Sequence, residues 1–112
     1  MRTKEQYIKE MHDKDRLVLV TDDNNIVKAM LGFSIVSNPM IKRDDVWSIP
    51  NEDMRGDYIL IDRLITDRLT PIKCNLRMVI EYLKNRFPNK KVIWNTRRKN
   101  AEHEVFAENI IV

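Results

Sequence analysis

The stretch LITDRLTPIKCNLRMVIEYL, residues 64–83, places basic side chains where a predicted strand runs into a predicted helix. Lys73 lies in the expected first turn, where exposed backbone N–H groups and the helix dipole both attract an anion. A phosphate of a cofactor or of a nucleic-acid backbone would suit this junction. The alternative is a helix that simply begins with a basic turn, because the junction contains no glycine to open its backbone. The candidate anion-binding residues are Arg68, Thr70, Lys73, Asn75 and Arg77.

Asp62 is the first candidate for acid–base chemistry. It lies within DYILIDRLITD, residues 57–67, where both faces of the predicted strand are largely apolar. A partly buried carboxylate in such a strand could act as a general base. A salt bridge to Arg63 or Lys91 at the sheet surface is the alternative. His103 is a second candidate, since histidine side chains commonly titrate near neutral pH.

The sequence predicts no metal site. The two histidines, His12 and His103, and the single cysteine, Cys74, lack the spacing of zinc ligands. Cys74 on a helix is expected to pack as a small apolar residue, and a Cys–His nucleophile pair is the alternative. The chain also lacks Gly-x-Ser-x-Gly, the P-loop and the dinucleotide fingerprint, which leaves those enzyme classes without sequence support.

Residues 84–100 form a basic tract with seven basic residues and no acid. Such a local field favours an anionic partner, and a solvated rim is the alternative. Phe87 and Trp94 are expected in the core, so a nucleic-acid contact would be led by phosphates, sensitive to salt and weakly specific. The basic residues of the tract are Lys84, Arg86, Lys90, Lys91, Arg97, Arg98 and Lys99.

Length and composition predict one domain, residues 1–112, because a chain of this size supports one modest core. A hydrophobic content of 43% and a charged content of 33% are typical of a soluble globular protein. The longest uncharged apolar run, residues 29–36, is far shorter than a membrane span, so no membrane association is expected. The polar first residues resemble no secretory signal, and a single cysteine fits a reducing compartment, so the predicted location is the cytoplasm.

The pattern of apolar residues predicts an α+β fold with a mixed sheet. DDNN is a turn signal that joins two strands into an N-terminal hairpin. The order strand, helix, strand over residues 57–96 predicts a βαβ crossover with a parallel pair. The predicted elements are a helix over 4–12, strands over 16–22, 26–36 and 57–67, a helix over 71–87, a strand over 90–96, a short helix over 101–109 and a terminal strand.

Three stretches resemble the GCN5-related N-acetyltransferases. YILIDRLITD is similar to the fourth strand of that family, and NLRMVIEYLKNRFPNKKVIW to the following helix and fifth strand. NAEHEVFAENIIV can be aligned with the family segment N-x-x-A-x-x-apolar-Tyr-x-x-x-Gly-Phe. The resemblance covers about residues 16–112. It implies an acyl-coenzyme A site at the 68–77 turn, with Asp62 near the place of a glutamate that relays a proton.

The departures from the family pattern concern the chemistry. The pyrophosphate-binding loop of the family, Arg/Gln-x-x-Gly-x-Gly/Ala, is replaced by DRLTPIKCN, which has no glycine and has Pro71 in the first turn. A proline removes one backbone N–H that could bind phosphate. Ala107 stands at the usual position of the tyrosine general acid, and the closing hairpin of the family is missing. Small degenerate members of this fold occur among bacteriophage proteins, including internal virion proteins, and IWNTRRKN is similar to those.

Three function classes follow. The preferred one is a non-catalytic relative that acts in binding or assembly, as a phage virion or host-interaction protein, with self-association through the sheet edge near NIIV. It would need no cofactor. The second is an N-acetyltransferase that uses acetyl-coenzyme A, with Asp62 as the general base. The third is a basic protein that associates with nucleic acid through the tract at residues 84–99.

Overall fold

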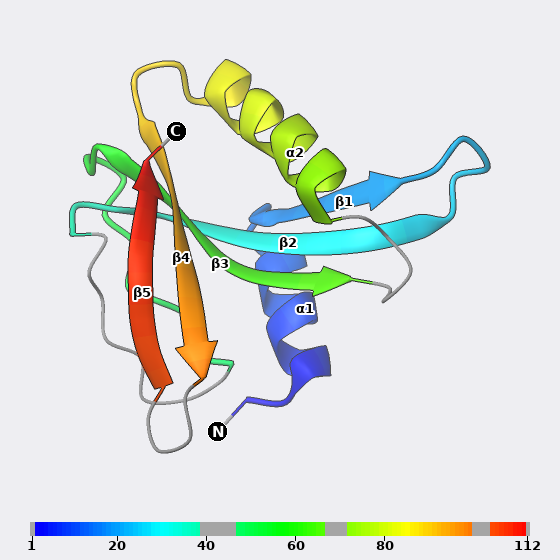
Figure 1. Ribbon diagram of the computed structural model, residues 1–112, viewed down its shortest axis with the longest axis horizontal. Coiled ribbons are helices and arrows are strands. Elements are labelled where there is room, and N and C mark those ends of the chain that lie inside the picture. The colour runs from blue at the N-terminus through cyan, green and yellow to red at the C-terminus, as the bar shows by residue number, and fades with distance from the viewer. Residues whose placement is uncertain (1, 39–46, 67–71, 100–103, 112) are drawn as a thin grey trace.

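The computed structural model describes residues 2–38, 47–66, 72–99 and 104–111, and of residues 66, 72–76, 94–99 and 104–111 it describes the backbone alone (Figure 1). Two helices and five strands follow one another along these residues. In chain order they are α1 (Lys4–Asp13), β1 (Leu17–Thr21), β2 (Val27–Val36), β3 (Tyr58–Thr66), α2 (Ile72–Arg86), β4 (Lys91–Lys99) and β5 (Glu104–Ile111).

The strands form one mixed sheet in the order β1-β2-β3-β4-β5. Neighbouring strands are antiparallel, except that β3 and β4 run parallel and are connected through α2. The predicted α+β class with a mixed sheet is therefore confirmed. The hairpin of β1 and β2 and the parallel pair are both present, with ends close to the predicted ones.

The predicted short helix near the C-terminus is wrong, whereas the predicted terminal strand is present at Ile110 and Ile111 as part of a longer strand. The sequence predicts a short helix over residues 101–109, whereas Glu104–Ile111 form β5, paired antiparallel with β4 from Lys99↔Glu104 to Ile93↔Ile111. Valine, phenylalanine and isoleucine in this segment favour a strand, and β4 offers it a free side opposite β3. Because this segment is a strand, the structure does not support its alignment with a helical family segment, nor the comparison of Ala107 with a tyrosine general acid.

The two helices cover opposite faces of the sheet (Figure 1). On one face, Val79 and Leu83 of α2 are buried against the sheet, in a cluster completed by Val20, Ala29, Leu31, Phe33, Ile59, Ile61 and Val92. On the other face, Tyr7 and Met11 of α1 are fully buried. A smaller cluster, Val36, Leu60 and Ile93, continues this second face. As predicted, β3 is a central strand with apolar residues on both faces.

α1 is fixed to the sheet by a close approach at Gly32. A Cβ atom built there would lie 1.9 Å from the Tyr7 hydroxyl oxygen, so only glycine fits under this ring. Thr3 begins the helix with a capping box, in which its hydroxyl accepts from the Gln6 N–H and the Gln6 side chain accepts from the Thr3 N–H. The sequence therefore specifies where α1 begins and how closely it packs.

Candidate functional site

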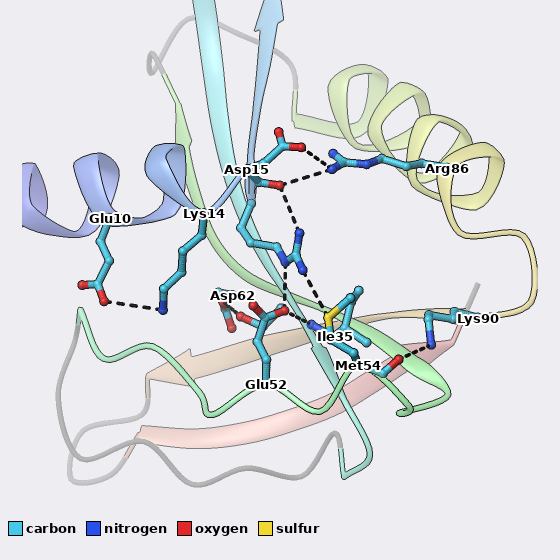
Figure 2. Close-up of polar contacts among 11 residues, drawn as sticks. Glu10, Lys14, Asp15, Ile35, Glu52, Met54, Asp62, Arg86 and Lys90 are labelled. Carbon is cyan, nitrogen blue, oxygen red and sulfur yellow. Dashed lines mark hydrogen bonds and ion pairs between the residues drawn. The ribbon is translucent and has the colours of Figure 1, made fainter.

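Asp62 lies at an irregular point of the sheet. Gly32 pairs with Arg63 and Phe33 pairs with Ile61, so Asp62 is the extra residue of a β-bulge in β3. Its side chain is 6% exposed, and its Oδ2 accepts a hydrogen bond of 2.7 Å from the Ser34 hydroxyl, which is itself buried (Figure 2). Asp62 is thus held inside the protein by a partner on the neighbouring strand.

The bulge coincides with the divergence of the two parallel strands. β3 and β4 pair from Tyr58↔Lys91 to Ile61↔Trp94, and Asp62 is the first residue of β3 beyond that pairing. From there β3 continues along β2 to Thr66, while β4 continues along β5 to Lys99 (Figure 1). Bulges bend strands and re-aim side chains, and they are frequent beside active sites.

Two members of the basic tract are used within the protein. Arg86, at the end of α2, contacts Asp15 with 2.5 Å between its Nη2 and Oδ2, and its guanidinium lies over the rings of Phe33 and Phe87. Lys90 donates to the carbonyl oxygen of Met54 (Figure 2) and also to that of Gly56. These contacts join segments far apart in the sequence, and they leave both side chains less free to bind an external anion.

The remaining candidates of the tract and of the helix junction do not form one described site. Lys84 and Lys91 are exposed, and Arg77 is 86% exposed with its Nε 3.8 Å from a carboxylate oxygen of Glu81. The backbone alone is described for Lys73 and Asn75 in α2 and for Arg97, Arg98 and Lys99 in β4. Arg68, Thr70 and His103 lie outside the described residues. An anion site at this junction stays a prediction.

Sequence reasoning missed the surface around β1. This strand is at one end of the sheet order, and half-exposed apolar side chains gather beside it: Leu19 at 49%, Val27 at 44%, Met78 at 62% and Tyr82 at 48%. A groove of about 370 Å³ runs between β1 and α2 and is lined by Leu17–Thr21, Met78, Val79 and Tyr82. The signal that could have indicated this surface is the run LVLV, which carries no charge.

A second groove opens on the other face of β1. It has a volume of about 530 Å³ and lies between the strands and α1. Leu17, Leu19, Val27 and Met30 form its apolar floor, and one stripe of α1 forms its wall, with Glu5, Ile8, Lys9 and His12. We call β1 with these two grooves the β1 surface. It can receive apolar side chains on both faces of the strand.

The outer side of α1 carries an ion-pair cluster. The Arg2 guanidinium, 2.6 Å from Glu10, holds the pKa of the Glu10 carboxyl below its ordinary value of 4.5 through a hydrogen bond, against a weaker desolvation effect. Lys14 lies 3.5 Å from the same carboxyl group and lowers its pKa further. Because Glu10 is partly exposed, this cluster contributes modestly to stability.

Comparison of the chain with protein-family models, with curated proteins and with solved structures found no match. Among the described residues, no group of three or more His, Cys, Asp or Glu side chains is arranged to hold a metal ion. In the same part of the chain, no helix has the length and apolar character needed to cross a membrane.

Proposed function

We propose that this protein is a non-catalytic relative of the N-acetyltransferase fold that acts in binding or assembly through the β1 surface. The observation that carries the proposal is an edge strand of five residues with an apolar groove on each face. Edge strands with uncovered apolar surroundings are the places where sheets receive an additional strand from a partner. The predicted setting, a phage virion or host-interaction protein, rests on the family resemblance.

The environment of Asp62 supports a structural role for the candidate base. A general base must come within hydrogen-bond distance of the proton that it takes. Asp62 is almost fully buried and already accepts from Ser34, which is held on the central strand β2. This arrangement is that of a carboxylate that fixes a bulge, so catalysis is not required to explain it.

A strand-forming probe tests the proposal directly. A fluorescently labelled peptide with the sequence RLVLVTD, residues 16–22, should bind the full chain saturably, because its apolar side chains suit both grooves. Met78→Glu and Tyr82→Glu, which place a charge in the α2 groove, should weaken binding at least about tenfold, equal to about 1.4 kcal/mol. The same charge change at exposed Asn89, Asn89→Glu, is the control and should leave binding unchanged. Absence of saturable peptide binding at protein concentrations where the chain is monomeric would refute the proposal.

One observation favours the second function, an acyl-coenzyme A-dependent N-acetyltransferase. The bulge at Asp62 lies where β3 and β4 separate, which is an arrangement that enzymes use to bring a side chain to a substrate. Acetyl-coenzyme A that binds only the folded state would raise the melting temperature. A clear rise at millimolar acetyl-coenzyme A, together with acyl transfer that Asp62→Asn abolishes, would establish this function in place of the first.

A further inference from the structure

The outer edge of β1 presents backbone groups that the described part of the chain does not pair. The Phe33 N–H donates to the Arg16 carbonyl, and the Asp22 N–H donates to the Ile26 carbonyl, so residues 16 and 22 face β2. Since backbone groups alternate along an antiparallel strand, residues 18 and 20 also face β2. The N–H and C=O groups of Leu17, Leu19 and Thr21 therefore point away from the sheet.

Beyond the end of β1, the outer edge of β2 is hydrogen-bonded to a loop, whereas the outer edge of β1 is open in the described part of the chain. Beyond β1, the backbone of Ile35 on β2 is bonded to the loop: its N–H donates to Glu52 at 2.9 Å, and its C=O accepts from the Asp53 N–H at 2.9 Å. β1 is short, and its pairing with β2 has one irregularity between Val20 and Thr21, but two other common protections of an edge strand are missing from it. Its five residues, LVLVT, include no charge and no proline.

The two faces of β1 define what an added strand must look like. Side chains of such a strand alternate between the groove beside α1 and the groove beside α2. The groove beside α2 is lined mostly by apolar residues, and the groove beside α1 has an apolar floor and a wall that includes Glu5, Lys9 and His12. The occupant must therefore carry consecutive apolar residues rather than alternating ones. The segment Leu17–Val20 of this same chain has that composition, which makes the edge self-complementary.

Resting on the proposed function, we infer that the occupant is β1 of a second copy, paired antiparallel about a two-fold axis at Leu19. In this register Leu19 pairs with Leu19 of the second copy, and Leu17 pairs with its Thr21, so all the outward backbone groups of both strands are used. The two sheets become one continuous sheet. An isologous contact of this kind closes on itself and stops at a dimer.

The charges and the helices are compatible with this register. Arg16 of one copy lies opposite Asp22 of the other, so no like charges meet at the strand ends. Within each copy the Arg16 Nε lies 2.9 Å from Glu52, and the Asp22 carboxylate accepts from the N–H groups of Asn24 and Ile26. A two-fold axis perpendicular to the sheet keeps the two copies of α2 on the same face. The half-exposed Met78 and Tyr82 of α2 then lie beside the junction, where contact with the other copy can cover them.

Charge substitutions at Leu19 test both the dimer and its register. Leu19 is half-exposed, so Leu19→Glu and Leu19→Lys change the surface and leave the core untouched. Each variant alone places like charges directly opposite each other at the axis and should dissociate at least about tenfold more readily. An equimolar mixture should form the heterodimer, since glutamate then faces lysine. Asn89→Glu and Asn89→Lys make the same charge changes in the exposed turn after α2 and should stay dimeric.

Sedimentation velocity over roughly 1–200 μM protein gives the readout, with circular dichroism to verify that each variant is folded. Hydrogen exchange adds a second readout: the amides of Leu17, Leu19 and Thr21 should exchange more slowly as the protein concentration rises. A monomeric wild-type chain, a dimer that survives Leu19→Glu, or a mixture that stays monomeric would each overturn the inference. A monomer that still binds the RLVLVTD peptide would overturn the second copy as occupant while leaving the binding function intact.

Discussion

The hydrogen bond between Ser34 and Asp62 decides whether the bulge is a structural feature, and Ser34→Ala is the perturbation that tests it. The Ser34 side chain is 1% exposed and Asp62 is 6% exposed, so water does not replace the lost hydroxyl without rearrangement. The Oγ–Oδ2 distance of 2.7 Å is that of a well-formed hydrogen bond. Removing one partner of a buried hydrogen bond costs about 1–3 kcal/mol.

Urea unfolding is the appropriate assay for this change. A loss of about 1–3 kcal/mol is a large part of the roughly 5–15 kcal/mol that holds a domain folded. With a slope of about 1–3 kcal/mol per molar urea, the unfolding midpoint should fall by about 1 M while the slope stays constant. Ser37→Ala is the matched control, because Ser37 follows the end of β2 and is exposed, so the same chemical change should cost under about 0.5 kcal/mol.

A double-mutant cycle separates the pair from the rest of the bulge. Asp62→Asn keeps the shape of the side chain, and the free energies of Ser34→Ala, Asp62→Asn and the double variant should differ from additivity by about 0.5–3 kcal/mol. If Ser34→Ala costs no more than Ser37→Ala, and the cycle is additive, the hydrogen bond does not hold Asp62. The structural interpretation of this carboxylate would then be refuted.

Three further predictions concern the packing of the helices. Gly32→Ala should destabilise the protein by about 1–3 kcal/mol in urea unfolding, because the new Cβ would meet the Tyr7 hydroxyl. Adding Tyr7→Phe should restore part of this loss. If the effects of the two substitutions are purely additive, the contact is contradicted. Leu83→Ala should lower the free energy of unfolding by about 2–5 kcal/mol, because Leu83 is fully buried in the cluster under α2. The control Lys84→Ala, at an exposed position, should lower it by less than about 0.5 kcal/mol. Equal losses would place Leu83 outside the core. Glu10→Gln should cost at most about 1 kcal/mol at pH 7. Because the folded pKa of Glu10 is lowered, its contribution is present above its ordinary pKa of 4.5 and is lost as the pH falls through the folded value. The difference between wild type and variant in urea unfolding should therefore shrink as the pH falls below 4.5, and a difference that stays constant would exclude this cause.

Most of the fold could be predicted because each correct element carries its own local signal. The alternation in DYILIDRLITD and the helical spacing of Val79 and Leu83 specify β3 and α2 without reference to any other segment. The strand β5 could not be predicted in the same way. Its segment contains residues that suit either structure, and pairing with the free side of β4 determines that it is a strand.

The candidate site was less predictable, since its contacts join distant residues. Arg86 meets Asp15 across 71 positions, and Lys90 meets Gly56 across 34, so no local pattern indicates that these basic side chains bind within the protein. The bulge at Asp62 is a property of the register between β2 and β3. That register becomes visible only when both strands are placed.

The two edges of the sheet differ in a way that favours β1 over the predicted C-terminal edge as the place of association. β5 is the last strand at its edge, and its segment includes Glu104, Glu108 and Asn109, polar residues of the kind that discourage further pairing. β1 has the composition of a strand covered on both faces, a run of Leu and Val without polar alternation, yet it lies at an edge. That composition suits a strand with α2 beside one face and α1 beside the other, and it leaves the outer backbone groups of β1 without a charged residue among them. The same strand of a second copy has a matching composition and would use these groups, which is why we infer association at β1.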